Sequence, residues 1–232
     1  MNHSMISSLI VHIMATGVII IATVFAVILI AVAFLFSEKA KVKRGLRRYP
    51  QTNIGSFPPG GLGSVKGKVV LHGQSLTAPL SGRACVYYRV IVEEHRSSGK
   101  SSHWHKIIDD VQSGTVLISD GSGYALINAK KSRSHIVSDA NYRSGTFNDA
   151  TPELENFLQQ HNRQSTGLLN FNKSLRYKEG ILEENELIAV GGKGEWKDAA
   201  ALGFNLPVQR VLVITEAENA KLFLTDDPSV MG

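Results

Sequence analysis

Residues 9–36 read LIVHIMATGVIIIATVFAVILIAVAFLF and contain no aspartate, glutamate, lysine or arginine. A helix needs roughly 20 residues to cross the ~30 Å hydrocarbon core of a bilayer, so this stretch is long enough to span one with some tilt. A signal peptide carries a basic region before an apolar core of about 7–15 residues, whereas no lysine or arginine precedes Leu9. The sequence therefore predicts an uncleaved transmembrane helix at 9–36 after a short tail at 1–8.

A basic segment, EKAKVKRGLRR at residues 38–48, follows the apolar stretch directly. Basic residues beside a span stay on the cytoplasmic side of the membrane. They predict a single-pass protein with its N-terminus outside and its C-terminal domain in the cytoplasm. The single cysteine, Cys85, agrees, because oxidising compartments favour paired cysteines. The residues expected to face the membrane surface are Lys39, Lys41, Lys43, Arg44, Arg47 and Arg48.

The same segment accounts for the formal net charge of +5, because residues 49–232 carry 19 basic and 19 acidic side chains. Nucleic-acid binding requires basic residues that cluster on the folded domain. We therefore expect the lipid bilayer, and no nucleic acid, as a partner of this chain.

Small residues recur along the apolar helix at spacings of seven, four and seven, at Ala15, Ala22, Ala26 and Ala33. Such spacing lines one helix face with small side chains and allows a second helix to approach closely. The pattern permits a homo-oligomer, although alanine is also common in membrane spans.

Tyr49–Ser64, YPQTNIGSFPPGGLGS, has three prolines and four glycines and no hydrophobic periodicity. This composition is typical of a flexible linker. Residues 37–64 are therefore predicted to form a basic juxtamembrane segment and a Pro/Gly linker, and residues 65–232 a single domain.

The domain reads as mainly β. Strands rich in β-branched and aromatic residues are expected at 65–71, 84–94, 104–111, 115–119, 124–128, 186–191, 208–215 and 221–225. Asp120-Gly-Ser-Gly123 predicts a hairpin turn, and Gly191-Gly-Lys-Gly194 a turn that ends a strand. The expected architecture is a small antiparallel barrel or sandwich, with an OB-like barrel as one form.

A polar insertion at about 129–178 interrupts the strands and carries one helix. Thr151 is a good N-cap, Pro152 suits the first helical position, and Leu154, Phe157 and Leu158 form a short apolar stripe. The acidic pairs Glu183-Glu184 and Asp226-Asp227 are expected to lie in loops and to face solvent.

Two blocks of the domain resemble a known family. APLSGRACVYYRVIVEE at 78–94 and LISDGSGYALI at 117–127, together with Trp104 and LIAVG at 187–191, resemble the GIDE domain, also called the beside-a-membrane (BAM) domain. That domain occurs in membrane-anchored E3 ubiquitin ligases of organelles and in prokaryotic membrane proteins. The ligases recruit their conjugating enzyme through a RING finger, which needs an array of zinc-binding cysteines and histidines, and this chain has one cysteine.

The resemblance therefore implies a protein-binding module beside a membrane and carries no catalytic residue over to this chain. It points to three contact surfaces: the turn at 79–82, the tyrosine pair at 87–88 and the hairpin turn at 120–123. The expected contact residues are Pro79, Ser81, Gly82, Tyr87, Tyr88, Asp120, Gly121 and Gly123.

Three histidines form a candidate metal site. His103 and His105 share one face of an expected strand, and His95 ends the strand before it. Imidazoles together with Glu93 or Glu94 would be a ligand set that transition metals accept. The spacing matches no established zinc motif, so solvated polar side chains are the alternative interpretation.

We therefore expect a membrane-anchored cytosolic interaction or regulatory module with no catalytic centre of its own, no cofactor and an unidentified protein partner. The alternative is an enzyme component. It would be either a ubiquitin-ligase-like subunit that acts with a separate RING subunit, or a metal-assisted hydrolase that uses the three histidines. Cys85 begins a strand without a Cys-His signature, so a buried thiol is expected there.

Overall fold

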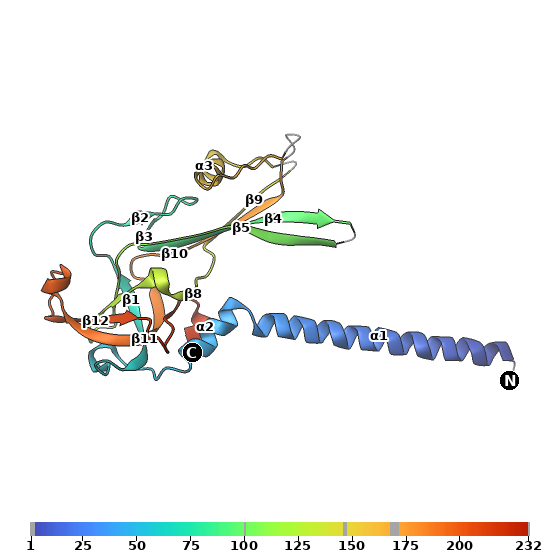
Figure 1. The fold of residues 1–232 in the computed structure, drawn as a ribbon, viewed down its shortest axis with the longest axis horizontal. Helices are drawn as coiled ribbons and strands as arrows, with labels where there is room; N and C mark the ends of the chain where they lie inside the picture. Colours follow the sequence, from blue (N-terminus) through green and yellow to red (C-terminus); the bar gives the residue numbers. More distant parts are fainter. Residues whose placement is uncertain (1–2, 100, 146–147, 168–171, 232) are drawn as a thin grey trace. The chain divides into compact units, whose positions relative to one another are not determined.

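The computed structural model describes residues 3–99, 101–145, 148–167 and 172–231 (Figure 1). The chain divides into two compact units, Met1–Lys41 and Val42–Gly232. The second unit begins well before residue 65, where the sequence predicted the start of the domain, because residues 42–64 pack on the strands that follow them.

The first unit contains α1 (His3–Leu35) and the first residues of α2 (Glu38–Leu46). The 20 residues Thr16–Leu35 have a mean hydropathy of 3.3, so α1 is long and apolar enough to cross a membrane. Ala22, Ala26 and Ala33 have exposed side chains on this helix, whereas the side chain of Ala15 lies outside the described part of the chain.

A closed barrel of five strands forms the centre of the second unit, which confirms the expectation of a mainly-β barrel. The strands follow the order β1-β6-β7-β12-β11, and β11 pairs with β1 to close the barrel. All neighbours are antiparallel except β7 and β12. Their bounds are β1 (Leu62–Val70), β6 (Val116–Ser119), β7 (Tyr124–Ile127), β11 (Leu187–Asp198) and β12 (Arg210–Thr215).

Short elements extend the barrel. The strand β13 pairs with β11, and β8 pairs with β13. The bounds of the short elements are β2 (Leu76–Thr77), β3 (Ala84–Cys85), β8 (Arg133–His135), β13 (Phe223–Thr225), α4 (Pro228–Met231), and the 3₁₀ helices η1 (Ile54–Ser56), η2 (Ala129–Lys131) and η3 (Ala200–Leu202).

A second sheet of four strands forms a separate layer from β1, β11 and β12 (Figure 1). Its order is β5-β4-β10-β9. The connection between β1 and β6 supplies two of its strands, and the connection between β7 and β11 supplies the other two. Their bounds are β4 (Tyr87–Ser98), β5 (Ser101–Ser113), β9 (Ala140–Ser144) and β10 (Leu175–Leu182).

The helix α3 (Pro152–Gln160) packs on one face of this sheet through Leu154, Phe157 and Leu158. Its predicted start is confirmed, because the Thr151 hydroxyl accepts a hydrogen bond from the Leu154 N–H at 3.5 Å. The region 129–178 is more regular than the polar insertion that the sequence suggested. In addition to α3 it contains β8, β9 and the first half of β10.

Residues 49–61 pack on the barrel and do not form the free linker that their composition predicted. Ile54 and Phe57 are buried in the barrel core. The indole N–H of Trp196 donates a hydrogen bond to the Phe57 carbonyl at 3.1 Å. Prolines and glycines keep this segment out of a ladder, but two buried apolar side chains are enough to fix it on the domain.

The strand β11 continues through Gly191–Gly194, where the sequence predicted a turn. An added Cβ at Gly194 would lie 2.3 Å from the Phe57 ring, and one at Gly191 would lie 2.6 Å from the Tyr49 ring. These glycines therefore stay in the strand and admit aromatic rings against the backbone, which is a common reason for glycine inside a strand.

The second half of α2 packs on the outside of the barrel. Val42 and Leu46 are buried against Phe223. Gly45 allows this contact, because a Cβ at that position would lie 2.3 Å from the Phe223 ring. The Lys43 ammonium group donates to the Ser229 carbonyl at 2.7 Å and ties α2 to α4.

Substitution of Phe57 by alanine tests whether the segment before β1 belongs to the fold. We expect Phe57→Ala to lower the unfolding free energy by about 3–5 kcal/mol, because it leaves a cavity in the barrel core. Chemical denaturation of the full chain in neutral detergent measures this loss. The control, Leu71→Ala, removes an exposed side chain and should change stability by about 0.5 kcal/mol or less. Equal stability of both variants would show that residues 49–61 are a spacer after all.

Candidate functional site

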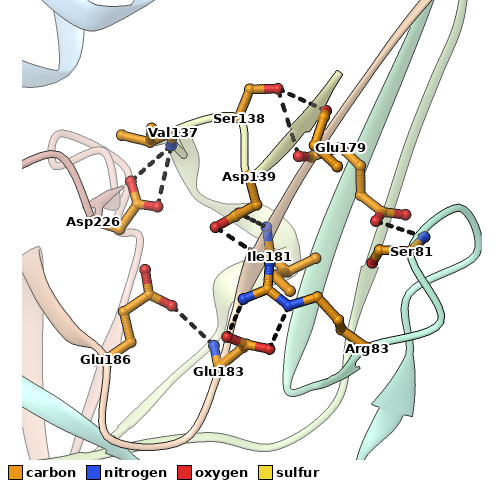
Figure 2. Close-up of polar contacts among 11 residues, drawn as sticks. Ser81, Arg83, Val137, Ser138, Asp139, Glu179, Ile181, Glu183, Glu186 and Asp226 are labelled. Carbon is orange, nitrogen blue, oxygen red and sulfur yellow. Dashed lines mark hydrogen bonds and ion pairs between the residues drawn. The ribbon is translucent and has the colours of Figure 1, made fainter. Parts of the chain in front are cut away.

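The predicted contact turn at 79–82 is held by a buried carboxylate on β10 (Figure 2). Glu179 has no exposed surface, and its two oxygens accept hydrogen bonds from the backbone N–H groups of Leu80 and Ser81 at 2.8 and 3.0 Å. Gly82 has a φ of +70°, as the turn composition predicted. The Ser81 hydroxyl oxygen is buried and has no hydrogen-bond partner among the described residues. The turn therefore owes its shape to Glu179 and not to its own serine.

Arg83 links the same turn to two further acids. Its guanidinium group makes a two-pronged contact with the Glu183 carboxylate, with one Nε to Oε1 distance of 2.9 Å. It also lies 3.8 Å from the Asp139 carboxylate. Asp139 in turn accepts a hydrogen bond from the Ile181 N–H at 2.9 Å. Figure 2 shows these groups side by side between the turn and β10.

Asp226 and Glu186 complete the cluster from the side of the barrel (Figure 2). Both oxygens of Asp226 accept from the Val137 N–H, at 2.8 and 3.1 Å, and Glu186 accepts from the Glu183 N–H at 2.9 Å. Asp226 and its neighbour Asp227 are buried, so the expectation that this pair faces solvent was wrong. Their oxygens bond to backbone N–H groups that would otherwise be unsatisfied.

The electrostatics of the cluster favour proton uptake. Burial, followed by the nearby charges of Glu186 and Asp139, raises the pKa of Asp226 to about 7. Burial also raises the pKa of Glu186, with Asp139 and Glu183 adding to the effect. The pKa of the Cys85 thiol rises to about 11, first through burial and then through the charge of Glu179. A thiol in that state is not a nucleophile at neutral pH.

We call Arg83, Asp139, Glu179, Glu183, Glu186 and Asp226 the carboxylate junction. Its members bind backbone N–H groups of the turn at 79–82, the loop at 137–139 and β10. They therefore join the second sheet to the barrel and its extension. Within the described part of the chain, no three histidine, cysteine, aspartate or glutamate side chains are placed to hold a metal ion.

The two other predicted contact surfaces also have roles within the chain. Tyr87 is buried and its hydroxyl lies 2.9 Å from the Ser134 hydroxyl, so it offers no surface to a partner, contrary to the prediction. Tyr88 is half-buried against the core of the second sheet. The hairpin turn at 120–123 is confirmed, and Gly121 has a φ of +85°.

The hairpin turn is occupied by the segment before β1. Asp120 accepts a hydrogen bond from the Ile54 N–H at 2.8 Å, and the Ser122 hydroxyl accepts one from the Gly55 N–H at 2.9 Å. A Cβ at Gly123 would lie 3.0 Å from Ile54. The turn therefore fixes residues 54–55 on the barrel.

The three histidines do not converge. His95 lies directly opposite Trp104 in the β4–β5 ladder, and opposite residues point to the same face of a sheet. His103 and His105 flank Trp104 and so lie on the other face. The His95 ring packs on Trp104, with centroids 5.1 Å apart. The third imidazole of the predicted metal site therefore lies on the opposite face of the sheet from the other two, and the Glu93 and Glu94 carboxylates accept hydrogen bonds from Arg176 and Arg96.

Sequence reasoning missed the carboxylate junction. The pattern that could have predicted it is LRYKEGIL at 175–182, where Leu175, Tyr177 and Glu179 alternate with other residues and so share one face of a strand. All three are buried in the structure. An acid at an apolar position of an alternating strand indicates a buried acceptor for backbone N–H groups. The sequence does not indicate the donors to Glu179, because the Leu80 N–H comes from almost a hundred residues away in the chain.

No family model, curated protein or solved structure matches the chain.

The raised pKa of Asp226 predicts a pH dependence of stability. The folded chain binds this proton more tightly than the unfolded chain, so the stabilisation is complete below pH ~4 and is lost as the pH rises through about 7. Asp226→Asn keeps an oxygen for the Val137 N–H and removes the titration. The unfolding free energy of the natural chain, relative to the variant, should fall by about 2–3 kcal/mol between pH 5 and pH 8. Denaturation curves that differ by a constant amount at both pH values would contradict this assignment.

Proposed function

We propose that this chain is a membrane-anchored cytosolic module that binds a protein partner and has no catalytic centre of its own. The domain would be tethered by the span at 9–36, oriented by the basic segment at 38–48. Support for the anchor comes from the length and hydropathy of α1 and from the positive charge that follows it.

The observation that carries the partner-binding role is the free edge of β5. This strand, Ser101–Ser113, is the outermost strand of the second sheet and pairs only with β4 among the described strands. An unpaired edge presents a row of backbone N–H and C=O groups that a strand from another protein can bind. The exposed side chains His103, His105 and Lys106 make this edge polar, which protects it against indiscriminate pairing.

Two structural assignments belong to this proposal. The five-stranded barrel, with its crossed connection between β7 and β11, supports an OB-like interpretation of the barrel. The GIDE resemblance fits a domain that follows a span after a short basic segment. Neither assignment brings catalytic residues, and the separation of His95 from His103 and His105 removes the basis for a metal-assisted hydrolase.

Cysteine labelling tests the orientation. A membrane-impermeant maleimide added to intact cells should label Ser4→Cys and should label Lys130→Cys only after permeabilisation, because only residue 4 would be outside. The natural chain is the control for background, since its only cysteine, Cys85, is buried. Labelling of Lys130→Cys in intact cells would reverse the proposed topology.

Photo-crosslinking tests the edge strand. Replacement of His103 or His105 by a photoreactive amino acid in the full chain should give the same covalent adduct to one membrane-associated or cytosolic protein. Glu195 and Lys197 are exposed positions on β11, a barrel strand that does not pair with β5, and serve as controls. Adducts of equal yield at the control positions, or none at the two β5 positions, would remove β5 as the binding edge.

A further inference from the structure

A cavity of about 240 Å³ lies between α2, the start of the barrel and α4. One part of its lining is apolar and consists of Leu46, Ala189, Val230 and Met231, which belong to one hydrophobic cluster. For comparison, an engineered apolar cavity of about 150 Å³ takes up benzene. This cavity is therefore large enough for a small apolar group.

Two cations flank the apolar lining. Arg47 follows α2 and is exposed, and Lys66 lies on β1 directly opposite Ala189 of β11, on the same outer face of the barrel. None of the described residues that line the cavity is an acid. An apolar hollow with a cationic rim complements an amphiphile that carries a negative charge.

The walls of the cavity are fixed before any ligand arrives. The Tyr49 hydroxyl donates a hydrogen bond to the Lys221 carbonyl at 2.8 Å, which holds the ring in the lining. The absence of a side chain at Gly191 lets Tyr49 and Leu46 approach β11. A preformed pocket binds without the entropic cost of ordering its walls.

Chain connectivity limits how far this cavity can lie from the apolar helix. Nine residues, 37–45, lie between Phe36, the last residue of the apolar stretch, and Leu46, so ten steps of the backbone join the two. A chain of that length reaches at most about 36 Å when it is fully extended. If residues 9–36 span the membrane, the cavity therefore lies no farther than this from the end of the span.

The size of the cavity selects among anionic ligands. Pockets that enclose whole drug-sized molecules have volumes of about 300–1,000 Å³, so this one is too small for a nucleotide or a complete lipid. It is suited to a part of an amphiphile whose remaining chains stay elsewhere. A phospholipid meets that description, since its acyl chains remain in the bilayer.

We propose that this cavity binds the headgroup of an anionic phospholipid. The phosphate would lie between Arg47 and Lys66, and the glycerol and first methylene groups would contact Leu46, Ala189 and Val230. The proposal depends on the proposed membrane anchoring for access to lipid. It goes beyond the general attraction of a basic segment to a membrane, because it specifies two cations and a cavity.

Native mass spectrometry of the full chain in neutral detergent, incubated with equal amounts of phosphatidylglycerol and phosphatidylcholine, tests the site. The natural chain should retain phosphatidylglycerol preferentially. The double variant Arg47→Gln/Lys66→Gln should lower that retention by about tenfold or more, because both charge-assisted contacts to the phosphate are lost.

The matched control is Arg44→Gln/Lys68→Gln. It removes the same total charge at Arg44, three residues before Arg47, and at Lys68, two residues after Lys66 on β1, and both are exposed positions that do not line the cavity. Its retention of phosphatidylglycerol should stay within about twofold of the natural chain, and Lys66→Arg, which keeps the charge, should also retain the lipid. Equal losses in both double variants would overturn the proposal in favour of diffuse electrostatic attraction.

Two further measurements separate the possible outcomes. Inorganic phosphate or glycerol phosphate that displaces phosphatidylglycerol at equal concentration would overturn the lipid assignment, because the site would then serve a soluble phosphate. Extraction of the chain from cell membranes with alkaline carbonate addresses the anchor separately. Complete release would refute the proposed anchoring, whereas the detergent experiment would still report on the cavity.

Discussion

Closure of the barrel by the β1–β11 ladder positions every other part of the second unit. The ladder runs from Leu62 opposite Lys193 to Lys68 opposite Leu187, and so joins two segments that the sequence separates widely. Such long-range pairing costs loop entropy, which the apolar interior of the barrel offsets. β11 also pairs with β12 and β13, and its glycines at 191 and 194 let the rings of Tyr49 and Phe57 pack against its backbone. The segment before β1, the end of α2 and the cavity all lie against this strand.

The second sheet depends on that closure. Its inner strands, β4 and β10, come from different connections of the barrel and form eight directly paired positions. Their ends must meet the barrel, and the backbone N–H groups at that meeting point have no ladder partner. The carboxylate junction supplies acceptors for them, and Arg83 offsets part of its negative charge. Burial, together with the nearby charges of Glu186 and Asp139, outweighs the hydrogen bonds from the Val137 N–H that favour the ionised form, which is why Asp226 has the most raised pKa among the carboxyl groups with a resolved shift.

The sequence predicted correctly those elements whose structure is determined by residues close together in the chain. The apolar run of α1, the Asp120–Gly123 turn and the Thr151 cap depend on neighbouring residues, and the structure bears each of them out as a structural element. Predictions from local composition were wrong where the position of a residue depends on contacts with residues far away in the chain. Phe57 lies in a segment with the composition of a linker, but its ring packs against Gly194. Asp226 was expected in a solvent-facing loop, but it accepts hydrogen bonds from the Val137 N–H in the loop after β8. The predicted metal site was wrong for a different reason, because the pairing register of β4 and β5 places His95 on the face of the sheet opposite to His103.

The proposed lipid site lies on the outside of the barrel, whereas the proposed protein site lies on an edge strand of the second sheet of the same unit. The cavity is lined by residues of α2, β1, β11 and α4, whereas β5 is an edge strand of the second sheet that pairs only with β4 among the described strands. A ligand couples two sites only if it binds two states of the element between them with different affinity. The element between them here is a closed barrel with a packed core, which has no free edge along which to shift. Lipid binding should therefore fix where the domain sits at the membrane surface without altering the affinity of β5 for its partner.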